Sequence, residues 1–505
     1  MRKWGRQSLL GAGVLSLAYS VWGFLLALMT IPVMINGLGL TSYGIYTLAF
    51  SVAGFGAFMD FGFGWTISKF VAEAEAQRDY GLLGATMRAG VLYYLAIGSL
   101  FVALVVPSAD WIARKILRSS TVDAPVMAKV LRIAAVSFIC SSMGGLFISA
   151  LRGMHRFAAA TLISIVGITS SVAGAAVAAW MGFGVLIAAS AQLFGASLGM
   201  VMGAWACHTQ LVKPIGTTSI RQQFHRMLGF SIWAYMNRLA QMFVLQADKI
   251  LVGRFGGAAF LPVYTVPFGF AQKINFLAGP AVTAIYPTAA AGQYDPETFM
   301  KQYFSGSRLV HILTGGVALA VLYWGNNFLA AWVGAELAHR SEFYLRVFTI
   351  GYWVVSVGSF DAGCVEGWNR PKVTFAIAAL GLVFAVIAAV ICRPALGDTR
   401  AIAIAVGTWL TILGIGSMMV WQRICRYPIG RFMRHIALPL LEMSFIGWVA
   451  TFAMRSLTRP RLLVIAILPV LAAGLGLYGY IRAFTGEERR TIFSRLTSSD
   501  LIADR

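Results

Sequence analysis

Long runs of apolar residues alternate along the chain with short polar or glycine- and proline-rich breaks. About fourteen runs can be delimited, each long enough for a helix that crosses the hydrocarbon core of a bilayer. They lack the strict apolar/polar alternation of membrane β-barrel strands. The predicted spans are 9–36, 41–68, 88–107, 131–151, 160–180, 184–206, 227–253, 262–289, 308–332, 346–367, 373–392, 401–422, 436–454 and 461–481. The pattern therefore predicts an all-α polytopic membrane protein of about fourteen transmembrane helices.

The spans contain an internal repeat. Tyr46, followed by threonine, opens the second span, and Tyr264, also followed by threonine, opens the eighth. A Gly-x-x-Arg tetrapeptide beginning at Gly153 precedes the fifth span, and another beginning at Gly367 precedes the eleventh at nearly the same separation. A repeat of six helices, an even number, keeps both copies in the same orientation, and such parallel repeats place a substrate between the halves.

The repeat divides the chain into two six-helix lobes and an addition. We predict an N-terminal lobe over residues 1–207, a cytoplasmic linker over 208–226, a C-terminal lobe over 227–425, and two extra helices with a cytoplasmic tail over 426–505. The predicted connections between spans are all short, which leaves no room for a soluble catalytic domain.

Composition supports a membrane location and argues against nucleic acid as a partner. Hydrophobic residues make up 59% of the chain and charged residues only 12%, about half the share in a soluble domain. The net charge of +21 comes from basic residues in short loops between apolar runs. Their bias towards the side that holds both termini predicts, by the positive-inside rule, a multi-pass protein with both termini in the cytoplasm.

Two cations interrupt the apolar spans near their centres. Arg238 lies in the seventh span and Lys273 in the eighth. A charge at such a depth costs roughly 2.5–3.5 kcal/mol on insertion scales, so it usually faces a water-filled cavity or a partner charge. Two cations at one depth on neighbouring helices favour a chamber for an anionic substrate. The alternative, in which each cation pairs with an acid and only holds helices together, stays open.

Polar residues accompany Arg238 along one stripe of the seventh span. At 100° per residue, Trp233, Asn237, Gln241 and Asp248 share a narrow face. We expect the first three, with the two cations, to bind substrate, and Asp248 to be a candidate for ion coupling.

The second span carries the other candidate for ion coupling. Asp60 lies on its inner half among glycines, and Asp361 occupies a comparable depth on the tenth span. Asp60 could titrate during transport, or it could be a structural ion-pair partner.

Basic residues also mark the corners before the fifth and eleventh spans. Arg152, Arg156 and Arg370 could attract a phosphate to the cytoplasmic rim, or they could be ordinary positive-inside charge. A phosphate-binding glycine loop, a metal-ligand cluster and a nucleophile elbow are all absent from the sequence. We therefore expect no cofactor, no metal and no enzymatic activity.

Several short motifs, in this order and spacing, resemble the polysaccharide translocases (of O-antigen, capsule or exopolysaccharide) in the multidrug/oligosaccharidyl-lipid/polysaccharide exporter superfamily. The likeness spans nearly the whole chain. The motifs are Leu38-Gly-Leu-Thr-Ser-Tyr43-Gly-Ile-Tyr46, Asp60-Phe-Gly-Phe-Gly, Gly153-Met-His-Arg156-Phe, Ala247-Asp248-Lys249-Ile250, and Tyr264 with Pro287.

The resemblance implies two six-helix lobes around a central cavity in the bacterial inner membrane. It implies an alternating-access flippase that moves an undecaprenyl-diphosphate-linked oligosaccharide from the cytoplasmic to the periplasmic leaflet. Family members often bind the diphosphate with basic lumen residues, for which Arg238 and Lys273 are the candidates here. The expected partners are membrane lipids and this polyisoprenoid-diphosphate-linked oligosaccharide. A polysaccharide polymerase or chain-length machinery is a candidate protein partner. We expect the protein to be a monomer.

Three alternatives to flipping fit the sequence less well. A cation-coupled multidrug antiporter of the same superfamily would need an acidic chamber, whereas the central residues here are basic. A membrane polymerase or ligase would need a substantial outer loop, and a pure scaffold would not explain cations at mid-depth.

Overall fold

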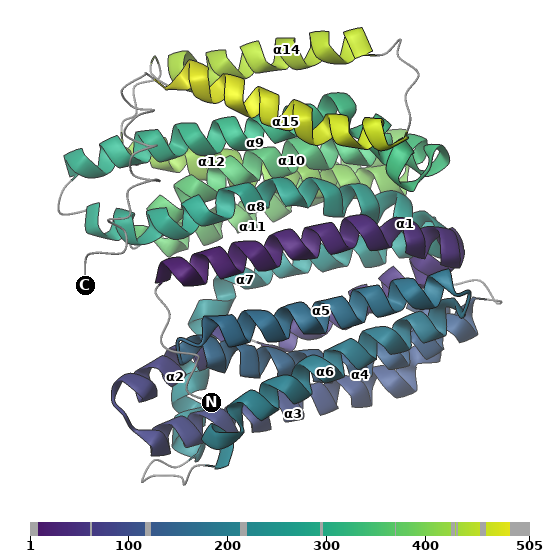
Figure 1. Ribbon diagram of the computed structural model, residues 1–505, viewed down its shortest axis with the longest axis vertical. Coiled ribbons are helices and arrows are strands. Elements are labelled where there is room, and N and C mark those ends of the chain that lie inside the picture. The colour runs from purple at the N-terminus through teal and green to yellow at the C-terminus, as the bar shows by residue number, and fades with distance from the viewer. Residues whose placement is uncertain are drawn as a thin grey trace. The chain divides into compact units, whose positions relative to one another are not determined.

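The computed structural model describes residues 9–60, 63–116, 123–212, 220–292, 296–368, 370–425, 430, 433–454 and 461–484. Throughout these residues the regular secondary structure is helical (Figure 1). The α-helices are α1 (Leu9–Phe55), α2 (Phe63–Ala76), α3 (Tyr80–Trp111), α4 (Ala124–Gly153), α5 (Phe157–Trp180), α6 (Gly184–Val212), α7 (Ile220–Gly256), α8 (Leu261–Gly292), α9 (Pro296–Val333), α10 (Ala335–Gly367), α11 (Pro371–Leu396), α12 (Asp398–Cys425), α14 (Leu438–Met454) and α15 (Arg461–Ala483). Short 3₁₀ turns η1 (Gly56–Asp60) and η3 (Ala258–Phe260) and π-helical turns η2 (Ile112–Ile116) and η4 (Met433–Ala437) join some of them.

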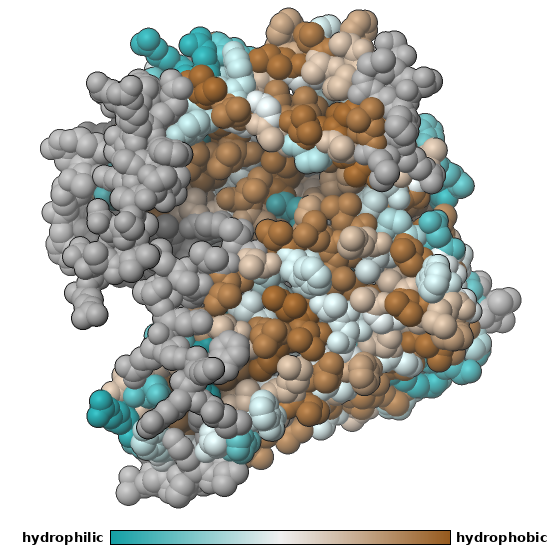
Figure 2. Space-filling model, in the orientation of Figure 1, coloured by the Kyte–Doolittle hydropathy of each residue, from teal (hydrophilic) through white to brown (hydrophobic). Residues whose placement is uncertain are grey.

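Every predicted span has a helical counterpart. Within the described residues, 11 helices are long and apolar enough to cross a membrane. Helix α1 contains the first predicted span and most of the second, which meet at Gly39, where φ is 77° and ψ is 163°. Helices α7 and α8 correspond to the seventh and eighth spans. Figure 2 shows apolar side chains covering much of the visible surface, with hydrophilic ones mainly near its margins, as expected of helices in a bilayer.

The second span is not the single helix that its hydropathy predicted. It is helical to Phe55, continues as the tight turn η1 to Asp60, and resumes as α2 at Phe63. A Cβ at Gly56 would lie 2.6 Å from the ring of Phe138, so a larger residue would force this ring on α4 to move. The break places Asp60 at the end of a turn instead of within a helix.

The chain divides into two compact units, each with its own core. Unit 1 comprises residues 1–265 and 392–402, and unit 2 comprises residues 266–391 and 403–505. In unit 1, α3, α4 and α6 lie side by side and α5 packs against α6 (Figure 1). In unit 2, α9 packs against α10, α14 and α15. These two units are defined by how the helices pack, whereas the predicted lobes are defined by the sequence repeat. The lobe boundaries therefore stay a prediction.

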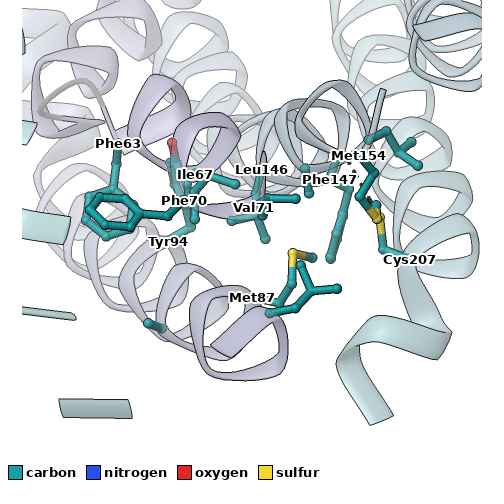
Figure 3. Close-up of a cluster of buried hydrophobic side chains, with 14 of the residues drawn as sticks. Phe63, Ile67, Phe70, Val71, Met87, Tyr94, Leu146, Phe147, Met154 and Cys207 are labelled. Atoms are coloured by element: carbon teal, nitrogen blue, oxygen red, sulfur yellow. Dashed lines mark hydrogen bonds between the residues drawn. The ribbon is translucent and has the colours of Figure 1, made fainter. Parts of the chain in front are cut away.

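An apolar cluster forms the core of unit 1 between α2, α3 and α4 (Figure 3). Phe63, Ile67 and Val71 project from α2 and are completely buried, as is Met87 on α3. Leu146 and Phe147 enter from α4. The stripe of residues 63, 67, 70, 71 and 74 on α2 has helical spacing, so this short helix lies with one apolar face on the core.

The core of unit 2 is rich in aromatic rings near the start of α9 and the ends of α10 and α12. Phe299, Tyr303 and Trp421 are at most 5% exposed, and the rings of Trp368 and Trp421 are 5.1 Å apart at 83°. Edge-to-face packing of this kind stabilises aromatic clusters beyond the area that they bury.

The internal repeat is visible in the backbone. Gly257, which is separated from Gly39 by the same offset as Tyr264 from Tyr46, has φ 77° and ψ 170°, close to the values at Gly39. Helices α5 and α11 begin at Phe157 and Pro371, with the offset of Gly153 and Gly367, and α6 and α12 begin at that offset too. The glycine conformation is in a region that other L-residues rarely adopt. Both copies thus bend at one position and start their helices in one register.

The glycine crossings repeat as well. A Cβ added to Gly358 on α10 would lie 2.3 Å from the Cα of Gly414 on α12. The equivalent Gly144 on α4 faces Met200 on α6, with the backbone nitrogen at 3.4 Å from its added Cβ. Small residues let membrane helices approach closely, and here they do so at the same place in both units.

Helix α7 begins well before its predicted span, at Ile220 instead of position 227. Ile220, Gln223, Phe224 and Met227 occupy one face of its first two turns, at the i, i+3, i+4, i+7 spacing of an amphipathic helix. Gln223 and Met227 are buried, and Phe224 packs against the core of unit 1. The end of the segment predicted as a linker is therefore a docked helix.

Candidate functional site

Lys273 lies in the middle of α8, about 18 Å along the axis from Leu261 at 1.5 Å per residue. Its side chain is half-buried, and its Nζ is 4.7 Å from the centre of the Phe276 ring. Among the carboxylates that the structure describes, none forms an ion pair with it. The cation–π contact offsets part of the desolvation cost but does not neutralise the charge.

The same face of α8 carries an exposed aromatic ring. Phe276, one turn after Lys273, is 49% exposed. An exposed residue in a membrane span meets either lipid or water. Because an ammonium is costly in lipid, the half-buried Lys273 favours a water-filled space on this side of α8.

The substrate-binding residues predicted on the seventh span cannot be compared with this geometry. Trp233, Asn237, Arg238 and Gln241 belong to α7, but their side chains lie outside the described residues. Their proposed contacts remain predictions from the sequence.

Asp248, one candidate for ion coupling, has a complete set of partners. It is 3% exposed, its Oδ2 accepts a hydrogen bond of 2.8 Å from the hydroxyl of Tyr264, and its Oδ1 accepts one of 2.7 Å from the backbone nitrogen of Lys249. The Nζ of Lys249 is 3.5 Å from Oδ1. The carboxylate thereby links α7 to the start of α8, a geometry suited to holding this corner together.

Asp60, the other candidate, lies beside the core of unit 1. Its Oδ1 accepts a hydrogen bond from the hydroxyl of Tyr94 on α3. The neighbouring Tyr93 donates to the carbonyl of Met59 at 2.7 Å, and both tyrosine rings contact Phe63. Two tyrosines thus tie the turn η1 to α3. Because Asp60 is only half-buried, it is more accessible to protons or ions than Asp248.

The three predicted rim arginines lie at equivalent corners of the two repeats. Arg152 is exposed in the last turn of α4, while Arg156 precedes α5 and Arg370 precedes α11. The backbone nitrogen of Arg156 donates to the carbonyl of Leu151 at 2.8 Å, and that of Arg370 donates to Val365 at 3.2 Å. The structure confirms a shared turn geometry, and the phosphate-attracting role stays a prediction.

No functional role for Asp361 is predicted from the sequence. This carboxylate on α10 is 3% exposed and accepts a hydrogen bond of 2.7 Å from the hydroxyl of Tyr303 on α9. The two residues are 58 positions apart, so sequence spacing contains no signal for the pair. In the described part of the chain, no three histidine, cysteine, aspartate or glutamate side chains gather as metal ligands would.

Comparison with known proteins gives matches in both sequence and structure. Residues 9–293, more than half of the chain, match the family described as polysaccharide biosynthesis protein. The chain is 21% identical over 378 residues to a protein of Shigella flexneri described as a putative O-antigen transporter, covering 72% of this chain and 88% of that protein.

Two solved structures are similar over most of their length. An inward-facing multidrug resistance MATE family transporter of the MOP superfamily has a TM-score of 0.66 at 17% identity, covering 80% of this chain and 94% of its own. The lipid II flippase MurJ, in an inward closed conformation, has a TM-score of 0.65 at 15% identity, covering 98% and 100%. At these identities the likeness shows a shared fold.

Proposed function

The chain belongs to the polysaccharide biosynthesis protein family, and from this premise we propose that it flips a polyisoprenoid-diphosphate-linked oligosaccharide across the bacterial inner membrane. Transport runs from the cytoplasmic to the periplasmic leaflet by alternating access. The names of the O-antigen transporter and the lipid II flippase support this substrate class. The fold by itself is equally compatible with a multidrug antiporter.

The environment of Lys273 is the observation that favours the flippase over the multidrug antiporter. A half-buried ammonium at mid-span, lacking an ion pair with any described carboxylate, attracts an anion and repels a cationic drug. In this proposal Lys273 and Arg238 neutralise the diphosphate. Trp233, Asn237 and Gln241 contact sugar hydroxyls, and Asp60 is the carboxylate best placed to couple transport to an ion.

Substitution of Lys273 tests the proposal. In a translocase-deficient strain, Lys273→Ala should lower surface polysaccharide at least about tenfold, because loss of one charge-assisted contact costs about 1.5–3 kcal/mol. Lys273→Arg should keep most of the activity, since it keeps the charge. Surface polysaccharide is measured alongside the amount of protein in the membrane.

Lys129→Ala is the matched control, since Lys129 is an exposed lysine in the first two turns of α4. It should complement like the wild type. If Lys273→Ala also complements fully, the cationic site is wrong, and export of a cationic drug by the purified protein would then favour the antiporter.

A further inference from the structure

The first two turns of α7 pack on α2 and α3 through a small interface of mixed polarity. The apolar contribution comes from Met227, which is completely buried, and from Phe224, whose ring centre is 6.1 Å from Phe63 and 6.2 Å from Tyr93. Ile220 completes the apolar face. This is a narrow contact compared with the full-length packing of α5 on α6.

A buried amide lies in the middle of that face. Gln223 is 1% exposed, and its Nε2 donates a hydrogen bond of 3.0 Å to the hydroxyl of Thr86 on α3. The Thr86 hydroxyl in turn donates to the carbonyl of Leu82 at 2.8 Å. A buried polar pair of this kind fixes the register of a helix but contributes less to stability than an apolar contact of the same size.

An ion pair closes the outer side of the interface. The Nη2 of Arg226 is 2.6 Å from the Oε1 of Glu73 on α2, and its guanidinium is 5.0 Å from the centre of the Phe70 ring. The Arg226 side chain is 53% exposed and that of Glu73 is 26% exposed. Water and ions reach this pair, so it is weak and exchangeable.

The opposite end of α7 is attached differently. There Asp248 is buried against Tyr264, and a Cβ at Gly253 would lie 2.8 Å from Leu48 on α1. Helix α7 is continuous between its two ends and contains Arg238, three turns after Arg226. The chain then passes into unit 2 at Val266. Movement of the substrate-binding part of α7 is therefore most easily accommodated at its first two turns.

We propose that residues 220–227 form a latch that holds the start of α7 on α2 and α3 in this conformation and detaches during transport. This proposal depends on the transport function proposed above. The latch lies beside an aromatic group formed by Phe63, Tyr93 and Tyr94. The same group holds the turn that ends at Asp60, because the hydroxyl of Tyr94 donates a hydrogen bond to that carboxylate. Release of α7 and rearrangement of this turn are thus mechanically linked.

Thiol labelling tests whether the ion pair holds the latch closed. With Cys392 and Cys425 replaced by serine, Met227→Cys should react slowly with N-ethylmaleimide, because position 227 is buried. Glu73→Arg or Arg226→Glu should raise that rate about three- to tenfold, since each puts like charges in place of the pair. The variant with both substitutions should again react at the slow rate.

Arg221→Glu, on the exposed face, is the control and should leave the labelling rate unchanged. Equal labelling in all variants overturns the latch, and this measurement does not depend on any transported substrate.

Cross-linking tests whether the latch opens in the cycle. Glu73→Cys and Arg226→Cys joined by a bis-methanethiosulfonate cross-linker, which spans the space that the two long side chains occupied, should abolish flipping, and a reducing agent should restore it. The same cross-link between Asp110→Cys and Arg132→Cys, which replaces another ion pair of unit 1 with an N–O distance of 2.5 Å, should leave flipping intact. Undiminished flipping with the first cross-link overturns the latch. A reduced protein that moves no lipid-linked oligosaccharide contradicts the proposed function instead.

Discussion

Two charged side chains in apolar spans are accommodated in opposite ways. Asp248 is enclosed by donors, with both carboxylate oxygens hydrogen-bonded inside unit 1. Lys273 keeps an open side beside Phe276. The first arrangement is what a structural charge requires, and the second is what a binding charge requires. The two environments thus differ, and the binding role of Lys273 and the ion-coupling role of Asp248 stay predictions.

Removal of the donor to Asp248 should destabilise the protein. Tyr264→Phe leaves a buried carboxylate oxygen without its hydroxyl, at a cost of about 1–3 kcal/mol. The loss is measured as a lower thermal unfolding temperature of the purified protein. Tyr46→Phe is the control, because that hydroxyl donates at 3.1 Å to the neutral amide of Gln192. Equal losses for the two variants would show that the carboxylate does not depend on Tyr264.

At the scale of the element, helix crossings at glycines define how closely α10 and α12 approach. The Gly358 position tolerates no side chain, whereas its counterpart Gly144 has space at van der Waals distance. Gly358→Ala should therefore force the helices apart, at a cost of about 1–3 kcal/mol for overpacking. Gly144→Ala should be neutral or slightly stabilising, since alanine favours the helix by up to about 1 kcal/mol.

Thermal unfolding of the two alanine variants checks this expectation. The repeat supplies the control, because the same substitution is made at the same place in the other copy. A loss of stability in Gly144→Ala as large as that in Gly358→Ala would contradict the assignment of the tight crossing.

The helices themselves could be predicted from the sequence because length and hydropathy determine them. Hydropathy could not predict the break between Phe55 and Phe63, which depends on the approach of Gly56 to Phe138 on a distant helix. The start of α7 at Ile220 did have a sequence signal, the spacing of Ile220, Gln223, Phe224 and Met227. The intervening Arg221, Gln222, His225 and Arg226 lower its hydropathy, which favours a linker over a membrane span.

The site could be predicted only in part, for a physical reason. A lone cation in an apolar run stands out in the sequence, as Lys273 does. Hydrogen-bond partners do not stand out, because Tyr94 and Asp60, or Tyr303 and Asp361, lie far apart in the chain and meet only through helix packing.

At the scale of the whole molecule, the orientation of the helices is a prediction from the loop charges. Alkaline phosphatase fused after Gly182, in the turn between α5 and α6, should be active because that turn is predicted to face the periplasm. Alkaline phosphatase fused after His155, between α4 and α5, should be inactive, because that turn is predicted to lie in the cytoplasm. This enzyme needs disulfides to fold, and disulfides form in the periplasm and not in the cytoplasm. Enzyme activity per unit of fusion protein is the measurement, and the reverse pattern would invert the topology.

The matching glycine bends at Gly39 and Gly257 have a consequence for the origin of the chain. Each copy has an even number of spans, so a second copy fused behind the first inserts in the same direction without new charges to reorient it. Inverted repeats, in contrast, need an ancestor that inserts both ways round. Tandem duplication of one gene, with a single topology throughout, is therefore sufficient to produce this architecture.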